Sequence, residues 1–326
     1  CSSLQSIKVD SDNKNFGDVG GVVFDKRKVK LLFYPEGKFY DNYQIPDGVE
    51  CLGEGAFRKN IILKRVVIPE SVTEIQDMCF WNCTNLQEIV IPKTVQIIGD
   101  NALHGTPFFE NCQDKFVILG NGILFKYNGS EENVTIPEGV TEIKPMAFFY
   151  CKELKSITIP ATVTKIGQNA FNSCINLREI RLIHKNGKIF RWDLTKLLYR
   201  QNFDRGLMML IHKKFDDDNY FERVDPKMKY ACILDYYLDI VDREATDYLF
   251  AKASDFICEF IQDGDLFHLQ RIGEETDLIT SENIDMYIDE AIERTQTGGS
   301  LELQMYLMDF KATHFGFFNP EEFFKL

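Results

Sequence analysis

The dipeptide Ile-Pro recurs along the first half of this 326-residue chain at a nearly constant spacing. Its copies occupy residues 45–46, 68–69, 91–92, 136–137 and 159–160. Successive copies are separated by 23, 23, 45 and 23 residues. A fixed period in the twenties is typical of a solenoid, in which every repeat forms one coil that stacks on its neighbours. The fullest copies start at Val66, Val134 and Ile157 and align without a gap.

Each repeat contains one short strand that we can place. In the copy that starts at Val66, Ile89 and Ile91 alternate with polar or exposed positions, as in a half-buried strand, and Pro92 ends the strand because it has no N–H to donate. The apolar spacing from Cys79 to Cys83 favours a helical turn. Stacked coils would pair their strands as a parallel sheet. We expect seven strands, which end near residues 9, 45, 68, 91, 136, 159 and 182.

Two segments interrupt the period, and both contain a glycine followed by an apolar run. The first run is Gly21-Val22-Val23-Phe24 and the second is Gly122-Ile123-Leu124-Phe125. In each case a turn and another apolar or aromatic stretch follow. We therefore expect a β-hairpin inserted into a coil at both places.

After Ile183 the period stops and helical spacing begins. Apolar stripes from Ile284 to Phe310, divided by Gly298-Gly299, predict an antiparallel helix pair. Further helical runs cover about 191–214, 226–240 and 243–262, so we expect five to seven helices. The predicted fold class is α+β, with a solenoid domain at 1–183 that starts in mid-repeat and an all-α domain at 184–326.

The helical domain is also expected to close the open end of the solenoid. The last coil would otherwise leave an unpaired strand and an apolar cross-section, which need a terminal cap. Apolar residues follow Ile183 at once, and we expect the first helices to dock on the last coil through them. They are Ile189, Phe190, Trp192, Leu194, Leu197 and Leu198.

The charge of the chain is unevenly distributed. Its 50 acidic and 37 basic residues give a net charge of −13; residues 1–183 hold 22 acidic and 20 basic groups, which leaves 28 and 17 for residues 184–326. The second half therefore has a net charge of −11, which repels phosphate backbones, and we expect no nucleic-acid partner. Every apolar stretch is too short for a membrane-spanning helix.

The nine cysteines form no Cys-x-x-Cys pair. Cys79 and Cys83 match no zinc motif, because no further Cys or His pair lies nearby. Cys1, Cys83, Cys151 and Cys174 share one position of the repeat, which favours buried thiols over disulfides. Cys1 could also be the lipidated start of a mature lipoprotein, but its spacing to Leu4 and Ile7 repeats that of Cys83 to Leu86 and Ile89.

Patterns that would indicate catalysis or cofactor binding are missing. The sequence has no P-loop, His-Glu-x-x-His zinc site or serine nucleophile elbow, and its five histidines are scattered, so surface or capping roles are expected for them. Asp10, Asp12 and Asn13 do not complete a calcium loop and indicate a turn. Asp216–Asp218 could bind a cation, although a solvated turn is the stronger interpretation. We predict no enzyme activity, cofactor or metal.

These repeats resemble the BspA-type leucine-rich repeats of bacterial surface proteins. The resemblance rests on Ile-Pro-x-x-Val-x-x-Ile followed by Ala-Phe-x-x-Cys-x-x-Leu-x-x-Ile, and on both inserts; Leu103 departs from it at the Phe position and Asn60 at the Cys position. It implies an adhesive or protein-binding leucine-rich-repeat solenoid without enzyme activity, located at the cell surface or secreted. The Ile284–Phe310 pair resembles an ankyrin-like helix pair, though without the ankyrin hairpin signature.

The candidate partner-binding residues are the exposed strand positions, which a solenoid repeats as columns on its sheet. Ordinary solvated side chains are the alternative interpretation of these positions. They are Arg65, Val67, Glu88, Val90, Asn133, Thr135, Ser156, Thr158, Glu179 and Arg181. We predict a monomeric binding protein that recognises a protein or another macromolecule. The competing hypothesis is a cytoplasmic interaction scaffold that uses the acidic helical domain.

Overall fold

The structure, a computed structural model, describes residues 3–196, 203–213, 226–240 and 242–316. The chain divides into two compact units. We call residues 1–154 together with 160–176 the repeat unit, and residues 155–159 together with 177–326 the C-terminal unit. The predicted domain boundary at residue 183 stays a prediction.

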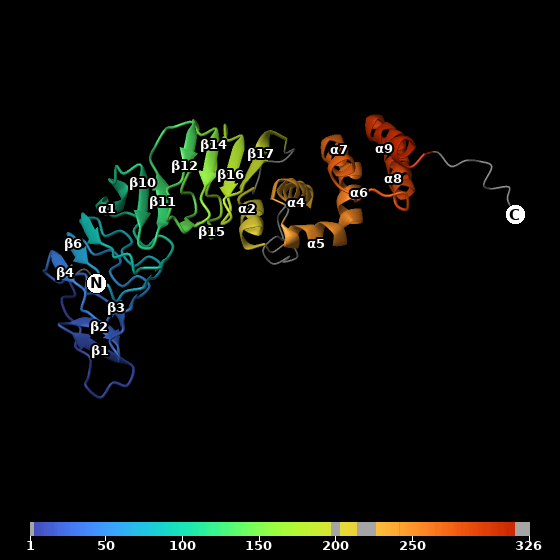
Figure 1. Cartoon of the computed structure of the whole chain (residues 1–326). Helices are drawn as coiled ribbons and strands as arrows, with labels where there is room; N and C mark the ends of the chain where they lie inside the picture. Colours follow the sequence, from blue (N-terminus) through green and yellow to red (C-terminus); the bar gives the residue numbers. More distant parts are fainter. Residues whose placement is uncertain (1–2, 197–202, 214–225, 241, 317–326) are drawn as a thin grey trace. The chain divides into compact units, whose positions relative to one another are not determined.

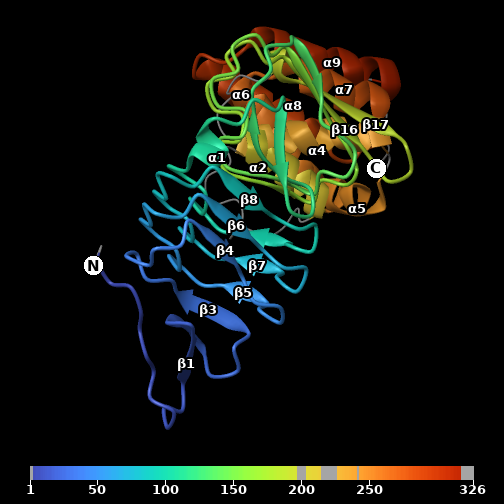
Figure 2. The same ribbon diagram turned by 90° about the vertical axis from the view of Figure 1, so that its left-hand side faces the viewer.

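The coils of the repeat unit form two rows of parallel strands (Figure 2). In the first row, β4 (Asn42–Gln44), β6 (Arg65–Val67) and β8 (Glu88–Val90) pair in register, each 23 residues after the last. In the second row, β5 (Cys51–Leu52), β7 (Glu74–Ile75) and β9 (Ile97–Ile98) pair in the same way. Strands β13 (Glu142–Ile143) and β15 (Lys165–Ile166) form a further parallel pair.

The predicted strands near residues 45, 68, 91 and 136 are confirmed by β4, β6, β8 and β12 (Asn133–Thr135). The strand expected near residue 9 is wrong, because residues 4–10 are not in a strand. Instead, the Ile7 N–H donates to the carbonyl of Gly21 at 3.0 Å. The second row was not predicted, since strands of two residues are too short to show an alternating pattern.

Both inserted hairpins are present. Strands β1 (Phe16–Val19), β2 (Val22–Asp25) and β3 (Lys30–Phe33) pair antiparallel in succession, and β3 then pairs parallel with β5. In the second insert, after the short helix α1 (Pro107–Glu110), β10 (Phe116–Leu119) pairs antiparallel with β11 (Ile123–Tyr127). The partner of the glycine-led strand therefore precedes it instead of following it. The prediction of a hairpin is confirmed, and the choice of its second strand was wrong.

The bend of each coil consists of successive turns, so the helical turn predicted for Cys79–Cys83 is wrong. Met78 and Asn82 both have a φ of +54°, in the left-handed region, and a continuous helix cannot contain such residues. The geometry lets the backbone bond to the next coil: Phe57 N donates to Cys79 O, and Phe80 N donates to Ala102 O, both at 2.8 Å. These bonds satisfy polar groups that the coil buries.

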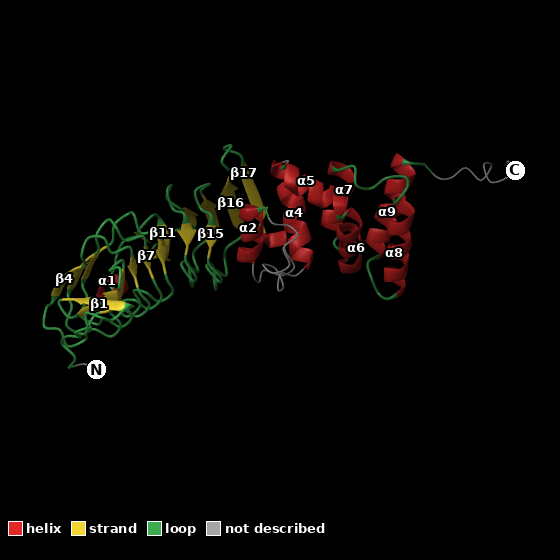
Figure 3. Ribbon diagram, turned by 90° about the horizontal axis from the view of Figure 1, so that it is seen from below, coloured by secondary structure: helices red, strands yellow, loops and turns green. Residues whose placement is uncertain are grey.

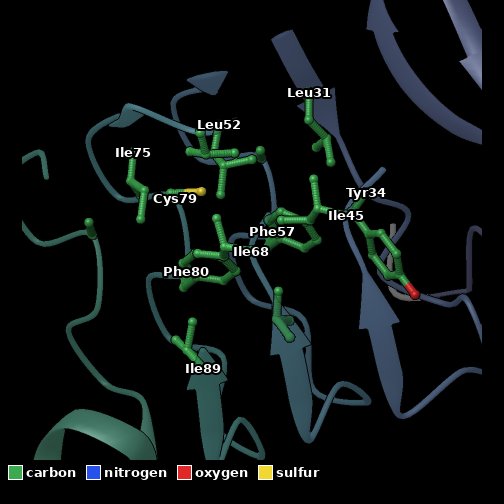
Figure 4. Close-up of a cluster of buried hydrophobic side chains, with 14 of the residues drawn as sticks. Leu31, Tyr34, Ile45, Leu52, Phe57, Ile68, Ile75, Cys79, Phe80 and Ile89 are labelled. Carbon is green, nitrogen blue, oxygen red and sulfur yellow. The ribbon is translucent and has the colours of Figure 1, made fainter. Parts of the chain in front are cut away.

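Aromatic rings stack from coil to coil inside the repeat unit (Figure 4). The Phe57 ring lies 5.2 Å from that of Tyr34 and 4.8 Å from that of Phe80. A second stack has Phe148 5.1 Å from Tyr127 and 5.3 Å from Phe171. The residue at the equivalent position between the two stacks is Leu103, which is buried but has no ring.

The Cys position of the repeat holds a hydrogen-bonding side chain. The Cys83 thiol donates to the Phe57 carbonyl at 2.9 Å, and the Cys174 thiol donates to that of Phe148 at 3.0 Å. Asn60 occupies this position in an earlier coil, where it is fully buried and its Oδ1 accepts from two backbone N–H groups at 2.8 and 2.9 Å. Cys83 is buried as expected, Cys151 and Cys174 are partly exposed, and Cys1 lies outside the described residues.

Three strands belong to the C-terminal unit. Strands β14 (Ser156–Ile159) and β16 (Glu179–Ile183) pair parallel at the predicted positions, and β17 (Ile189–Asp193) pairs antiparallel with β16. The prediction of a helix from residue 191 is therefore wrong in its first residues. Phe190 and Trp192 are fully buried while Ile189 and Arg191 are exposed, which is the period of a strand.

Helices make up the rest of the C-terminal unit (Figures 1 and 3). They follow the 3₁₀ turn η1 (Leu194–Lys196). The described helices are α2 (Phe203–His212), α4 (Pro226–Ile240), α5 (Arg243–Ala251), α6 (Ala253–Asp263), α7 (Leu266–Glu275), α8 (Ile284–Gln296) and α9 (Leu301–His314). The predictions for 226–240 and for the 284–310 pair are confirmed. The run at 243–262 forms two helices, with Lys252 as the residue between them.

Candidate functional site

The first row of strands in the repeat unit aligns the predicted contact residues into two columns. Asn42, Arg65 and Glu88 lie opposite one another in the hydrogen-bonded register, and so do Gln44, Val67 and Val90. Val66 and Ile89, the middle residues of β6 and β8, are buried. The flanking residues of each strand therefore point to the opposite face, where Arg65 and Glu88 are exposed.

Charge is balanced along the first column. The Arg65 Nε lies 2.9 Å from Glu88 Oε1, and both side chains are about half exposed, at 44% and 55%. Beside them, Lys64 Nζ lies 3.4 Å from Asp41 Oδ2. Such exposed pairs contribute little to stability, so these four charges remain free to exchange an intramolecular contact for one with a partner.

Two exposed aromatic side chains precede the column, and the sequence-based prediction missed them. Phe39 is 75% and Tyr40 65% exposed, immediately before β4. The Lys38 ammonium lies 5.4 Å from the Tyr40 ring centre, which is a cation–π distance. The available signal was an aromatic pair within the polar stretch from Gly37 to Asn42, where no core position is expected.

The remaining candidates differ in exposure. Asn133 and Thr135 are exposed on β12, on either side of the buried Val134. In the C-terminal unit, Ser156 lies opposite Glu179, and Thr158 lies opposite Arg181. Ser156 is buried, at 6% exposure, so the expectation that it is an exposed position is wrong.

Strand β17 extends the second set of candidates. Asp193 lies opposite Glu179, and Arg191 lies opposite Arg181. The Arg181 guanidinium is 2.5 Å from the Glu179 carboxylate, which raises the pKa of Arg181. The structure thus places the ten candidates in two units. Arg65, Val67, Glu88, Val90, Asn133 and Thr135 belong to the repeat unit, and Ser156, Thr158, Glu179 and Arg181 to the C-terminal unit.

Acidic and histidine side chains of the described residues serve local structure. Asp10 accepts from Asp12 N at 2.8 Å and Asn13 from Asn15 N at 2.9 Å, which confirms a turn there. His268 is buried with its Nδ1 2.7 Å from Asp265, the N-cap of α7. Within the described ranges, three or more His, Cys, Asp or Glu side chains nowhere gather as a metal site would require. Asp216–Asp218 lie outside those ranges.

The described helices were also compared with the requirements of a bilayer span. None of them is both long enough and apolar enough to cross a membrane.

Known structures resemble part of the chain. A leucine rich cell surface protein from Faecalibacterium prausnitzii is 28% identical with a TM-score of 0.35, over 56% of this chain and 42% of that one. A leucine-rich repeat protein from Eubacterium ventriosum is 23% identical with a TM-score of 0.34, over 55% and 42%. The pneumococcal vaccine antigen PcpA is 23% identical with a TM-score of 0.30, over 56% and 34%. This chain therefore spans less than half the length of each.

No curated protein matches the sequence. The family described as BspA type leucine rich repeat region matches in six copies, over residues 32–116 and 119–196. Those ranges cover half of the chain, including both rows of strands and the bends between them. The chain therefore belongs to the BspA-type leucine-rich repeat family.

Proposed function

We propose that this chain is a non-enzymatic binding protein that recognises a protein or another macromolecule through the exposed columns on β4, β6 and β8. The observation that carries the proposal is the in-register alignment of Asn42, Arg65 and Glu88 on adjacent strands. Membership of the BspA-type family supports a binding or adhesion role. We further propose a surface or secreted location and a monomeric state.

The chemistry of this face suits a macromolecular partner. Backbone hydrogen bonds fix the spacing of the columns, so the face loses little conformational freedom on binding. Arg65 and Glu88 offer charged hydrogen bonds, while Val67 and the 40% exposed Val90 offer apolar contact beside them. A second group, Glu179 and Arg181, would add polar contacts from the C-terminal unit.

The test compares binding by the wild type and by variants. Immobilised extracellular-matrix proteins and bacterial cell envelopes serve as the candidate partners, and bound protein is quantified. In the test variant, Arg65, Glu88, Glu179 and Arg181 are all changed to Ala; in the control variant, the exposed Lys93 and Glu138 are changed instead. We expect at least a tenfold loss for the test variant alone, because central charged contacts carry much of an interface's energy. Equal capture by all three proteins would reject the site.

A second candidate function is an intracellular scaffold that uses the acidic helices. It is favoured by the net charge of −11 over residues 184–326. The sequence upstream of Cys1 in the gene discriminates between the two functions. A signal peptide or a lipoprotein motif favours export, whereas an initiator Met followed by more repeats favours the cytoplasm.

A further inference from the structure

Helix α9 is apolar on two opposite faces. Leu303, Leu307 and Phe310 are buried on one face, where α9 packs against α7 and α8. On the other face, Leu301, Met305 and Met308 are 56%, 60% and 43% exposed. We call these three residues the α9 stripe. Their spacing of four and three residues places them in line on one helix face, a position that surface helices normally fill with polar residues.

Acidic side chains border the α9 stripe. Asp285 of α8 forms an ion pair with Lys311 of α9, so Asp285 lies beside α9, and the exposed Asp289 is one turn further along α8. Glu302 and Asp309, both exposed, are seven residues apart and lie together on the other side of the stripe. The basic group next to the stripe, Lys311, is neutralised by Asp285.

We propose that the α9 stripe is a docking surface for a basic amphipathic helix of a partner protein. The stripe supplies an apolar seat for one face of that helix, and the flexible Met side chains adapt to its shape. The acidic border attracts its Lys and Arg residues. A second copy of this chain would bring the same acidic border, and residues 317–326 contain Glu321 and Glu322 against the single Lys325. The charge therefore favours a basic partner over either. This inference is independent of the role proposed for the strand columns.

The first experiment uses a fluorescent model peptide of Leu and Lys with apolar residues at i, i+3, i+4 and i+7. Fluorescence anisotropy with the full chain should show binding on the order of micromolar that weakens as salt is added. Replacing every Lys by Glu should weaken binding at least tenfold, as should a peptide of the same composition without an apolar face. Equal binding of the Lys and Glu peptides would overturn the proposal.

The second experiment changes the stripe and its border. The Met305→Ser/Met308→Ser variant should bind the Lys peptide at least tenfold more weakly, while Phe250→Ser, a control at a 49% exposed apolar residue of α5, should bind as the wild type does. Glu302→Lys/Asp309→Lys should weaken binding and reduce its salt dependence, with Asp247→Lys on α5 as control. Circular dichroism checks that each variant is folded. Unchanged affinity in either double variant would contradict the proposal.

Two further measurements test the other occupants. Light scattering on the full chain should give a monomer; a dimer that Met305→Ser/Met308→Ser dissociates would show that the stripe binds a second copy. Deleting residues 317–326 should leave the affinity for the Lys peptide unchanged. A tenfold gain on deletion would show that the chain's own end covers the stripe, and it would overturn the proposal.

Discussion

The repeat unit and the C-terminal unit satisfy their backbones over very different distances along the sequence. In the repeat unit, hydrogen bonds join residues one period apart, as from Phe57 N to Cys79 O and from Phe80 N to Ala102 O. In the C-terminal unit, the described helices bond within themselves and pack through contacts that do not recur, such as Phe190 on Tyr236 at 5.5 Å between ring centres. Figure 3 shows the change from strands to helices along the chain.

The difference determines how each unit responds to a change in sequence. A repeated position has neighbours of its own kind in the next coil, so one departure is tolerated: Leu103 interrupts the ring stack and remains buried. A contact such as Phe190 with Tyr236 has no equivalent elsewhere in its unit. We therefore expect damage to be shared between coils in the repeat unit and to be specific to each contact in the C-terminal unit.

The largest effect is expected from truncation after residue 185, which tests our proposal that the helices cap the solenoid. Helix α4 packs on β17, and at the edge of that strand Arg191 N donates to Asp239 Oδ2 at 3.3 Å. Removing β17 and the helices would expose the edge of β16 and its apolar neighbours. We expect aggregation and a lower melting temperature, measured by light scattering and calorimetry. A soluble, monomeric fragment as heat-stable as the full chain would refute capping.

The next largest effect is expected from Phe80→Ala, which removes one ring from the stack of the repeat unit. Phe80 is fully buried and stacks on Phe57. The cavity should lower the free energy of unfolding of this unit by about 3–5 kcal/mol. Hydrogen exchange should accelerate in the coils on both sides of residue 80 and remain unchanged in α7 to α9. Trp81→Ala, at the partly exposed next residue, is the control, and an equal loss there would contradict the role of the stack.

A smaller effect, confined to the C-terminal unit, is expected from acid. Burial opposes the ionisation of Asp242, the N-cap of α5, but the Lys213 ammonium and backbone N–H groups bond its carboxylate and lower its pKa below 3.8. A carboxyl with a lowered pKa stabilises the fold above its unfolded-state pKa. That stabilisation disappears as pH falls through the lowered pKa.

Asp242→Asn should therefore lose about 1 kcal/mol at neutral pH and less in acid. Denaturation followed by helical circular dichroism at pH 7 and pH 3 measures the difference. Asp247→Asn, at an exposed position of the same helix, is the control. A loss for Asp242→Asn that stays the same at both pH values would show that its charge is not responsible.

The smallest effect concerns the thiols, which both units contain. Burial raises the pKa of Cys83 to about 12 and that of Cys232 well above its usual range, so neither should react with a thiol reagent in the native protein. The Cys174 side chain lowers the pKa of Cys151, which should react first. Mass spectrometry after alkylation measures each site. Unfolding without reductant should expose nearly all nine thiols, and two or more surviving disulfides would disprove the buried-thiol interpretation.

The sequence alone determined what its periodicity encodes. The period of 23 residues placed the strands near residues 45, 68 and 91, because each coil must present the same apolar positions to its neighbours. It also aligned Arg65 with Glu88 before any contact was known. The helix at 226–240 followed in the same way, since its apolar residues give a local pattern.

Only the tertiary structure decided the features that depend on non-local partners. The two-residue strands of the second row exist because adjacent coils pair them, and the left-handed Met78 and Asn82 are held by bonds to the following coil. Strand β17 forms because β16 offers it an edge, although its alternating burial could have indicated a strand. The exposure of Met305 and Met308 follows from where α7 and α8 pack on α9. A sequence pattern shows that a helix has two apolar faces, but only packing determines which of them remains open to a partner.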